Sequence, residues 1–386
     1  MKKLLLLGLF LSLGLAVKGW GQTAMETEYI IDSKAFDSER RIRIFVPERY
    51  FRDSNVVYTV TYMLDCQDDE VWNAVKGTIG YLVSRYRIMP MILVGIDSPD
   101  RGQEFRPERE ELRTHFREEV IPLVEATYRV NDFRTVIGHS WGGSLVGSTL
   151  FGPNSDLFNA YIGISPSLDA MGGVIHEQAD SLLRLGNPLP KFFYASAGGQ
   201  GQNEVESLEA IARMDSVIQA HPVKHLVWKQ EFFPSLDHWT CVLPSLNNGL
   251  VALSQQHFTD LPTIMAMVQK SEADLSSRMQ SYLGQQELIY GYAHWPTTYY
   301  LNRIGEDLRE QGYLEGGLSL VRWALENKPD YLRASINLVD IYRRMGKSVE
   351  AKQAAQRALE LLEAQKDQVS ESYYKAFVDW LQEEDE

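Results

Sequence analysis

The segment Thr135-Val136-Ile137-Gly138-His139-Ser140-Trp141-Gly142-Gly143 places a serine between an apolar, strand-like run and a glycine-rich helix start. In a nucleophile elbow the serine lies on a strained strand-to-helix turn, so only glycine fits two positions on either side. Gly138 and Gly142 hold those positions here. Composition alone would produce G-x-S-x-G in roughly one chain of this length in ten, and the flanking pattern lowers that chance further. The segment therefore predicts a nucleophilic serine, Ser140, at the end of a strand.

Short β-rich runs alternate with amphipathic helical stretches from about Thr27 to His257. This alternation is typical of a mostly parallel sheet whose crossover helices cover both faces, which is the α/β class. Two of the helical stretches, Leu112–Tyr128 and Glu204–Gln219, carry apolar residues at intervals of three and four. We expect the first two strands to form a hairpin at the sheet edge. The predicted strands are Glu28–Ala35, Arg41–Val46, Val56–Leu64, Met91–Ile96, Arg134–Gly138, Ala160–Ile164, Lys191–Ala197 and Lys224–Phe232.

After about Thr259 the strand-like runs cease and helical periodicity continues. This part matches itself at an offset of 34 residues and resembles the tetratricopeptide repeat, a helix-turn-helix unit of that length. Two ordinary helical hairpins remain the alternative, because such arrays usually need three units. We expect an α/β region at 27–258, a helical linker at 259–300, and an all-α helical-repeat module at 301–386 as a candidate surface for a protein partner. The matched pairs are Leu308/Tyr342, Gly312/Gly346, Ala324/Ala358 and Leu325/Leu359.

The first residues have the pattern of a signal peptide. Lys2 and Lys3 precede an apolar run from Leu4 to Val17, and small residues follow it. The run has 14 residues, which is fewer than the roughly 20 that a membrane-spanning helix needs. We therefore expect residues 1–22 to be a signal peptide and the mature chain to be exported, periplasmic or secreted, without a membrane span.

The chain carries 52 acidic and 38 basic residues, with a formal net charge of -14. This charge repels nucleic acid and anionic membranes, so we exclude a nucleic-acid partner. Cys66 and Cys241, the two cysteines of the chain, are too few for a disulfide scaffold and lack the close spacing of a zinc site. We expect no metal and no cofactor. The two cysteines fall in loops at the same end of the predicted sheet, so a bridge and two separate buried thiols both remain open.

A serine nucleophile needs a base to take its proton and a carboxylate to hold that base in the right tautomer. With a nucleophile elbow the chain order is serine, acid, histidine. His238 directly follows the last predicted strand in a loop and is the candidate base, with a surface loop histidine as the alternative. The other histidines after Ser140 lie in or beside predicted helices, in a strand, or in the helical tail; they are His176, His221, His225, His257 and His294.

The candidate acid is Glu204, the first carboxylate after the penultimate strand. Glu206 follows closely, and on a helix it would point about 200 degrees away from Glu204. A carboxylate at a helix N-terminus also has a purely structural use, so the choice between the two stays open.

The oxyanion formed in acyl transfer needs two N–H donors. We expect one from the backbone of Trp141 and the other from the loop after the third strand, where Cys66 and Gln67 are the candidates. His139 is expected to pack or hydrogen-bond locally, because its position points the side chain away from the tip of the elbow.

Several segments together resemble the putative esterase family of α/β-hydrolases, which is similar to esterase D and enterochelin esterase. The likeness covers about Glu28 to Gln256 and implies an α/β-hydrolase fold that cleaves carboxylic esters, such as siderophore or polysaccharide acyl esters. Cys66 stands where relatives usually carry glycine, and Pro244 lies later after the histidine than in the family. The segments are Tyr62–Asp65, Val94–Ile96, Glu119–Pro122, Gly138–Gly143, and His238 followed by Pro244.

The leading hypothesis is an exported serine ester hydrolase that works through an acyl-enzyme on a small-molecule or carbohydrate ester. An acyltransferase with the same triad is one alternative. A non-catalytic interaction protein with a decayed hydrolase domain is another, although decay usually removes the serine or histidine first. The excess of acidic over basic residues disfavours an anionic ferric siderophore as substrate, unless positive charge gathers at the pocket. The arginines that could supply it are Arg85, Arg87, Arg101 and Arg106.

Overall fold

The computed structural model of the chain describes residues 24–52, 56–85, 87–255, 261–291 and 296–382. The predicted signal peptide, His257 and His294 lie outside the described residues. Within these ranges no helix is long and apolar enough to cross a membrane.

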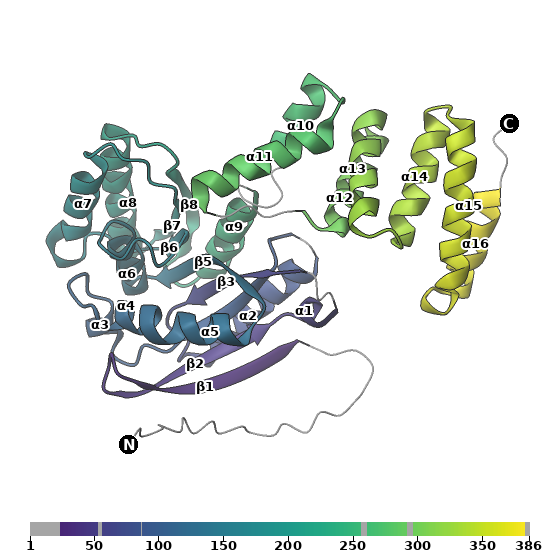
Figure 1. Ribbon diagram of the computed structural model, residues 1–386. Helices are drawn as coiled ribbons and strands as arrows, with labels where there is room; N and C mark the ends of the chain where they lie inside the picture. Colours follow the sequence, from purple (N-terminus) through teal and green to yellow (C-terminus); the bar gives the residue numbers. More distant parts are fainter. Residues whose placement is uncertain (1–23, 53–55, 86, 256–260, 292–295, 383–386) are drawn as a thin grey trace, which may run out of the picture.

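The described residues form one eight-stranded sheet with the order β1-β2-β4-β3-β5-β6-β7-β8 (Figure 1). β1 pairs antiparallel with β2, and β2 pairs antiparallel with β4. The remaining pairs are parallel. All eight predicted strands are present, and the predicted edge hairpin is confirmed. The strands are β1 (Met25–Ser33), β2 (Ser38–Val46), β3 (Tyr58–Met63), β4 (Met91–Ile96), β5 (Val130–His139), β6 (Ala160–Ile164), β7 (Phe192–Gln200) and β8 (Val227–Asp237).

The two edge strands end at other residues than predicted. β1 ends at Ser33 because the next two backbone N–H groups, of Lys34 and Ala35, donate to the Glu119 carboxylate instead of to a strand. β8 begins and ends later than predicted, because its pairing with β7 runs from Phe192 with Val227 to Gln200 with Asp237. His225 consequently lies in the turn before β8, with φ 72°.

Two hydrophobic cores lie on opposite faces of the sheet. In β4, Ile92 and Val94 contribute to one core and Met91 and Leu93 to the other, as expected for side chains that alternate across a strand. Burial on both faces explains why the central strands are continuous apolar runs. The first face is covered by α4 (Glu111–His115), the turn η1 (Phe116–Val120), α5 (Ile121–Thr127), α6 (Trp141–Leu150), α7 (Ala170–Leu183) and α8 (Gln202–Ala220), and the second by α2 (Asp69–Ser84) and α9 (Val242–Ser254); the short helices α1 (Arg49–Arg52) and α3 (Arg101–Glu104) lie in connections.

The predicted helix Leu112–Tyr128 is interrupted by the π-helical turn η1, in which the Ile121 N–H donates to the carbonyl of Phe116. Pro122 has no N–H and cannot form the ordinary helical hydrogen bond four residues back. A single π turn accommodates this missing donor. The predicted helix Glu204–Gln219 is present as α8.

The described part of the C-terminal region contains helices and no strand, and it extends to one side of the sheet (Figure 1). α12 and α14 begin at Thr298 and Leu332, which are 34 positions apart, and α13 and α15 begin at Leu314 and Ser348, with the same spacing. The two predicted helix pairs are thus present, and their assignment to the tetratricopeptide class stays a prediction. The helices are α10 (Leu261–Lys270), α11 (Leu275–Tyr290), α12 (Thr298–Glu310), α13 (Leu314–Asn327), α14 (Leu332–Arg344), α15 (Ser348–Ala364), the 3-10 turn η3 (Lys366–Gln368) and α16 (Glu371–Gln382).

The segment predicted as a linker takes part in the helical core. Val268 of α10 and Leu275 and Met279 of α11 are buried in one cluster with residues of α12 to α15. The bounds predicted for the domains stay a prediction, but a cut at position 301 would separate helices that pack together.

Candidate active site

Ser140 lies on a sharp turn between β5 and α6, with φ 59° and ψ -117°. A Cβ on Gly138 would lie 2.3 Å from the carbonyl oxygen of Gly142, and a Cβ on Gly143 would lie 2.4 Å from Pro166. Any larger residue would therefore displace the backbone of the turn. The Ser140 N–H donates to the carbonyl of Ile164 on the neighbouring strand at 2.9 Å, which fixes the elbow to the sheet.

Glu204 is completely buried in the first turn of α8. His238 Nδ1 lies 2.5 Å from Glu204 Oε1 and donates to it. The other carboxylate oxygen, Oε2, accepts from Ser165 Oγ at 2.9 Å and from the Gly198 N–H. Glu206 is exposed, and its carboxylate accepts from the side chain of Gln202. Of the two candidate carboxylates, Glu204 is therefore the one that contacts His238.

The turn after β8 positions His238. Asp237 Oδ1 accepts from the backbone N–H of Thr240 at 2.8 Å, from the Thr240 hydroxyl and from the N–H of Trp239 at 3.0 Å. These hydrogen bonds, with Thr240 contributing most, hold the pKa of Asp237 below its usual range. The tight turn directs the imidazole back towards α8 and the elbow.

Ser140 and His238 line the same pocket, which has a volume of about 300 Å³ and includes Trp141 and Glu206. In the described part of the chain no hydrogen bond joins the Ser140 hydroxyl to His238. Such bonds are often long without substrate and tighten when it binds. The structure thus brings the three residues predicted for the triad to one place.

His139 packs behind the catalytic candidates instead of facing the pocket of Ser140. Its Nε2–H donates to the carbonyl of His238 at 2.8 Å, and the two rings are 4.4 Å apart. Burial, and then the proximity of His238, lower the pKa of His139 to about 4. His139 therefore stays neutral near pH 7, and the predicted local hydrogen bonding is confirmed.

The loop after β3 lies against the elbow, but Cys66 does not suit the role of oxyanion donor. Its N–H already donates to the carbonyl of Ile96 at 3.0 Å, so this prediction is corrected. Gln67 and Trp141 remain the candidate backbone donors. The Arg101 guanidinium donates to both oxygens of Asp65, at 2.9 and 3.0 Å, and to the carbonyl of His139 at 3.4 Å. Arg101 thereby ties the loop to the elbow.

Both cysteines are buried free thiols, which decides between the two alternatives left open by the sequence. Cys66 Sγ donates to the carbonyl of Met63 at 3.3 Å, and Cys241 Sγ lies 3.1 Å from Ser165 Oγ. Burial raises the pKa of Cys241. Among the described residues, no three His, Cys, Asp or Glu side chains are grouped so that they could hold a metal ion.

Sequence reasoning missed Ser165 and Gly198, the two groups that hold the second oxygen of Glu204. Ser165 directly follows β6, and Gly198 lies near the end of β7. Both lie at the carboxyl ends of parallel strands, where ligands bind in such folds, and this position could have indicated a place in the site.

The sheet order, the elbow, and a serine, a glutamate and a histidine that follow β5, β7 and β8 in that chain order define an α/β-hydrolase. Residues 33–248 match the family model described as Putative esterase. This range is more than half of the chain, so the chain belongs to the putative esterase family and is a carboxylic ester hydrolase.

Solved structures share the fold at low sequence identity. An IroE-like serine hydrolase from Shewanella oneidensis is 17% identical, with a TM-score of 0.63, over 78% of this chain and 99% of that one. An uncharacterised protein from Capnocytophaga ochracea is 16% identical, with a TM-score of 0.64, over 87% of this chain and 94% of that one. The siderophore hydrolase EstB from Aspergillus nidulans is 17% identical, with a TM-score of 0.50, over 64% of this chain and 98% of that one. A search of curated proteins found no match.

Proposed function

We propose that the chain is a serine esterase that works through an acyl-enzyme, with Ser140 as nucleophile, His238 as general base and Glu204 as the residue that orients His238. The single observation that carries this proposal is the 2.5 Å bond between His238 Nδ1 and the buried Glu204 Oε1, because the same His238 lines the pocket of Ser140. This bond keeps the proton on Nδ1 and leaves Nε2 free to accept one.

In the first half-reaction, Ser140 Oγ attacks the ester carbonyl while His238 Nε2 takes the hydroxyl proton. The buried Glu204 carboxylate stabilises the imidazolium that forms. Backbone N–H groups of Trp141 and Gln67 are proposed to hold the oxyanion. Collapse of the intermediate breaks the bond to the alcohol, which leaves with the proton from His238. Water then repeats the sequence on the acyl-enzyme and releases the acid.

The substrate proposed for this site is a carboxylic ester of a small molecule or carbohydrate. EstB from Aspergillus nidulans is a siderophore hydrolase, and a siderophore ester is one candidate among these substrates. Export is proposed from the pattern of residues 1–22 alone.

The test compares the chain with Ser140→Ala in the hydrolysis of a small nitrophenyl ester. Removing a triad nucleophile can cost on the order of a millionfold in turnover. Ser84→Ala is the matched control, because Ser84 is an exposed serine at the far end of α2. If the folded Ser140→Ala variant kept more than about a tenth of the activity, Ser140 would not be the nucleophile.

A further inference from the structure

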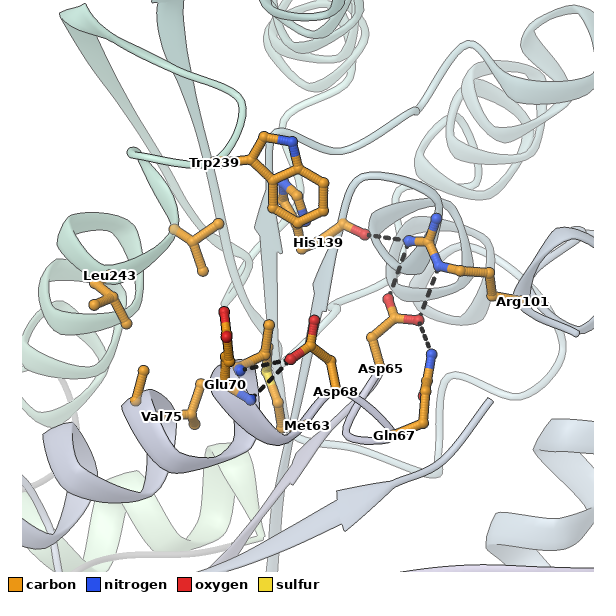
Figure 2. A pocket seen from close by; sticks show the side chains of 13 residues that line it. Met63, Asp65, Gln67, Asp68, Glu70, Val75, Arg101, His139, Trp239 and Leu243 are labelled. Atoms are coloured by element: carbon orange, nitrogen blue, oxygen red, sulfur yellow. Dashed lines mark hydrogen bonds and ion pairs between the residues drawn. The ribbon is translucent and has the colours of Figure 1, made fainter. Parts of the chain in front are cut away.

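A second pocket, of about 360 Å³, lies between the start of α2 and the start of α9 (Figure 2). His139 and Trp239 form part of its wall, whereas their chain neighbours Ser140 and His238 line the first pocket. The two pockets therefore adjoin at the elbow and at the His238 turn. The wall of the second cavity is thus built in part from the residues next in the chain to the two that would act on an ester.

The wall of the second pocket is largely apolar. Trp239 and Leu243 stand at it with 70% and 42% of their surfaces exposed, which is unusual for large apolar side chains. A concave apolar surface with few polar groups is the common form of a small-molecule site, and its volume falls in the usual range of about 300 to 1,000 Å³. The other apolar lining residues are Met63, Val71, Ala74, Val75 and Val242.

Three carboxylates and one arginine are the charged groups among the described residues of this pocket. Asp68 and Glu70 are exposed carboxylates in the pocket wall, at the start of α2 (Figure 2). Arg101 is the one lysine or arginine among the described lining residues, and both oxygens of Asp65 bind its guanidinium. The charge of Arg101 is therefore already balanced.

Arg85, Arg87 and Arg106, the other arginines considered from the sequence, are not among the described lining residues of either pocket. Arg106 pairs with Glu108 at 3.7 Å, and Arg85 packs over Tyr81 at the opposite end of α2. The pocket of Ser140 contains Glu206 and Asp169 and no lysine or arginine among its described lining residues. Asp169 pairs with Arg213 at 2.8 Å, so Glu206 carries the excess negative charge there. Both cavities therefore present excess negative charge to a substrate, which disfavours anionic esters.

We propose that the pocket between α2 and α9 binds an uncharged alkyl or aryl group of the ester cleaved at Ser140, and that its acidic rim rejects esters with an anionic group there. This inference rests on the proposed function. It narrows the substrates to neutral, apolar esters and argues against polyanionic ones.

The first experiment measures kcat/KM for nitrophenyl hexanoate and nitrophenyl acetate, in the unaltered chain and in Leu243→Asp. The acetyl group is too short to fill the pocket, so the hexanoate-to-acetate ratio should fall by about tenfold or more when a charge enters the apolar wall. Leu288→Asp is the control, because Leu288 is 88% exposed on α11; it should leave the ratio unchanged. Trp239→Ala, at another exposed wall position, should lower the same ratio and covers the case in which Leu243→Asp does not fold.

A second pair of substrates distinguishes the acyl part of the ester from the alcohol part. Hexyl acetate and ethyl acetate differ in the alcohol alone, so a fall in their ratio in either variant would place the alcohol chain in the pocket. A fall in either the acyl ratio or the alcohol ratio supports the proposal. Unchanged ratios in both series overturn it.

A third pair of substrates tests whether the acidic rim rejects esters with an anionic group. Nitrophenyl hydrogen adipate has the acyl length of the hexanoate with a terminal carboxylate, and we expect the hexanoate to be preferred by about tenfold or more, with a smaller preference in Glu70→Gln. An equal or greater rate with the adipate overturns the proposal. Hydrolysis with the wrong selectivity contradicts only this inference, whereas absence of any hydrolysis, with no labelling of Ser140 by an acylating probe, contradicts the proposed function.

Discussion

Replacing Glu204 by glutamine is the perturbation whose outcome the geometry defines best. One oxygen of Glu204 accepts from His238, and the other accepts from the Gly198 N–H and the Ser165 hydroxyl. An amide has one oxygen and one NH₂ group, so it cannot accept at both ends. The Gly198 N–H is a fixed donor and takes the amide oxygen. The NH₂ group is then turned towards His238 Nδ1 and forces the proton of the imidazole onto Nε2.

In that tautomer His238 cannot accept the proton of Ser140. Removing the charge of the acid in other triads lowers turnover by about ten-thousandfold, which corresponds to about 5 kcal/mol of transition-state stabilisation. Glu204 is completely buried, so water cannot take over its role. We expect a loss of this size in Glu204→Gln with the fold retained.

The assay is the hydrolysis of a small nitrophenyl ester, with circular dichroism to confirm folding. Glu206→Gln is the matched comparison, because Glu206 is an exposed carboxylate two residues away that does not contact His238; we expect it to change turnover by less than about tenfold. A Glu204→Gln variant with more than about a tenth of the original turnover would refute the reasoning. A large loss in Glu206→Gln alone would assign the acid to Glu206.

Three further outcomes are expected. Ser165→Ala removes a hydrogen bond to the charged Glu204 and should lower turnover by about tenfold to a hundredfold; a normal rate would show that the Gly198 N–H alone suffices. Because the pKa of His139 falls from 6.5 to about 4 on folding, the unfolded chain binds the extra proton as the pH drops, so the free energy of unfolding should fall through that window by up to about 3 kcal/mol. Urea titrations should show a shallower fall in His139→Gln, and an equal slope would contradict this origin. A chain that ends at Gln255 should keep its activity on a small ester, because the lining residues of both pockets lie between Met63 and Leu243; loss of activity in a folded truncation would give the helical region a part in the site.

The sequence predicted the strands and the catalytic candidates because both depend on local patterns. Glycines around Ser140 indicate a tight backbone turn, and the structure shows that Gly138 and Gly143 have no room for a Cβ, whereas a Cβ on Gly142 would make ordinary contacts at 3.5 Å. Apolar runs bounded by polar turns indicate buried strands. His238 was identified by its place after the last strand. The choice of the acid could be narrowed to two carboxylates, Glu204 and Glu206. In the structure α8 buries Glu204 and exposes Glu206, which decides between them.

The remaining features arise from contacts between distant segments. β2 lies beside β4 instead of β3, and nothing within either strand specifies that neighbour. The backbone N–H of Cys66 donates to the carbonyl of Ile96, a residue of the next strand. The oxyanion donor of this loop could therefore not be assigned from the sequence of the loop alone. The carboxylate of Glu119 ends β1 from more than 80 positions away.

The central claim is that Ser140 is an activated nucleophile, and labelling with a fluorophosphonate probe tests it most directly, because the probe reacts with an activated serine and not with one that is merely exposed. Peptide mass spectrometry should find the phosphonyl adduct on the peptide containing Ser140, and should find no adduct in Ser140→Ala. A folded chain that stays unlabelled, or an adduct on another serine, would contradict the account.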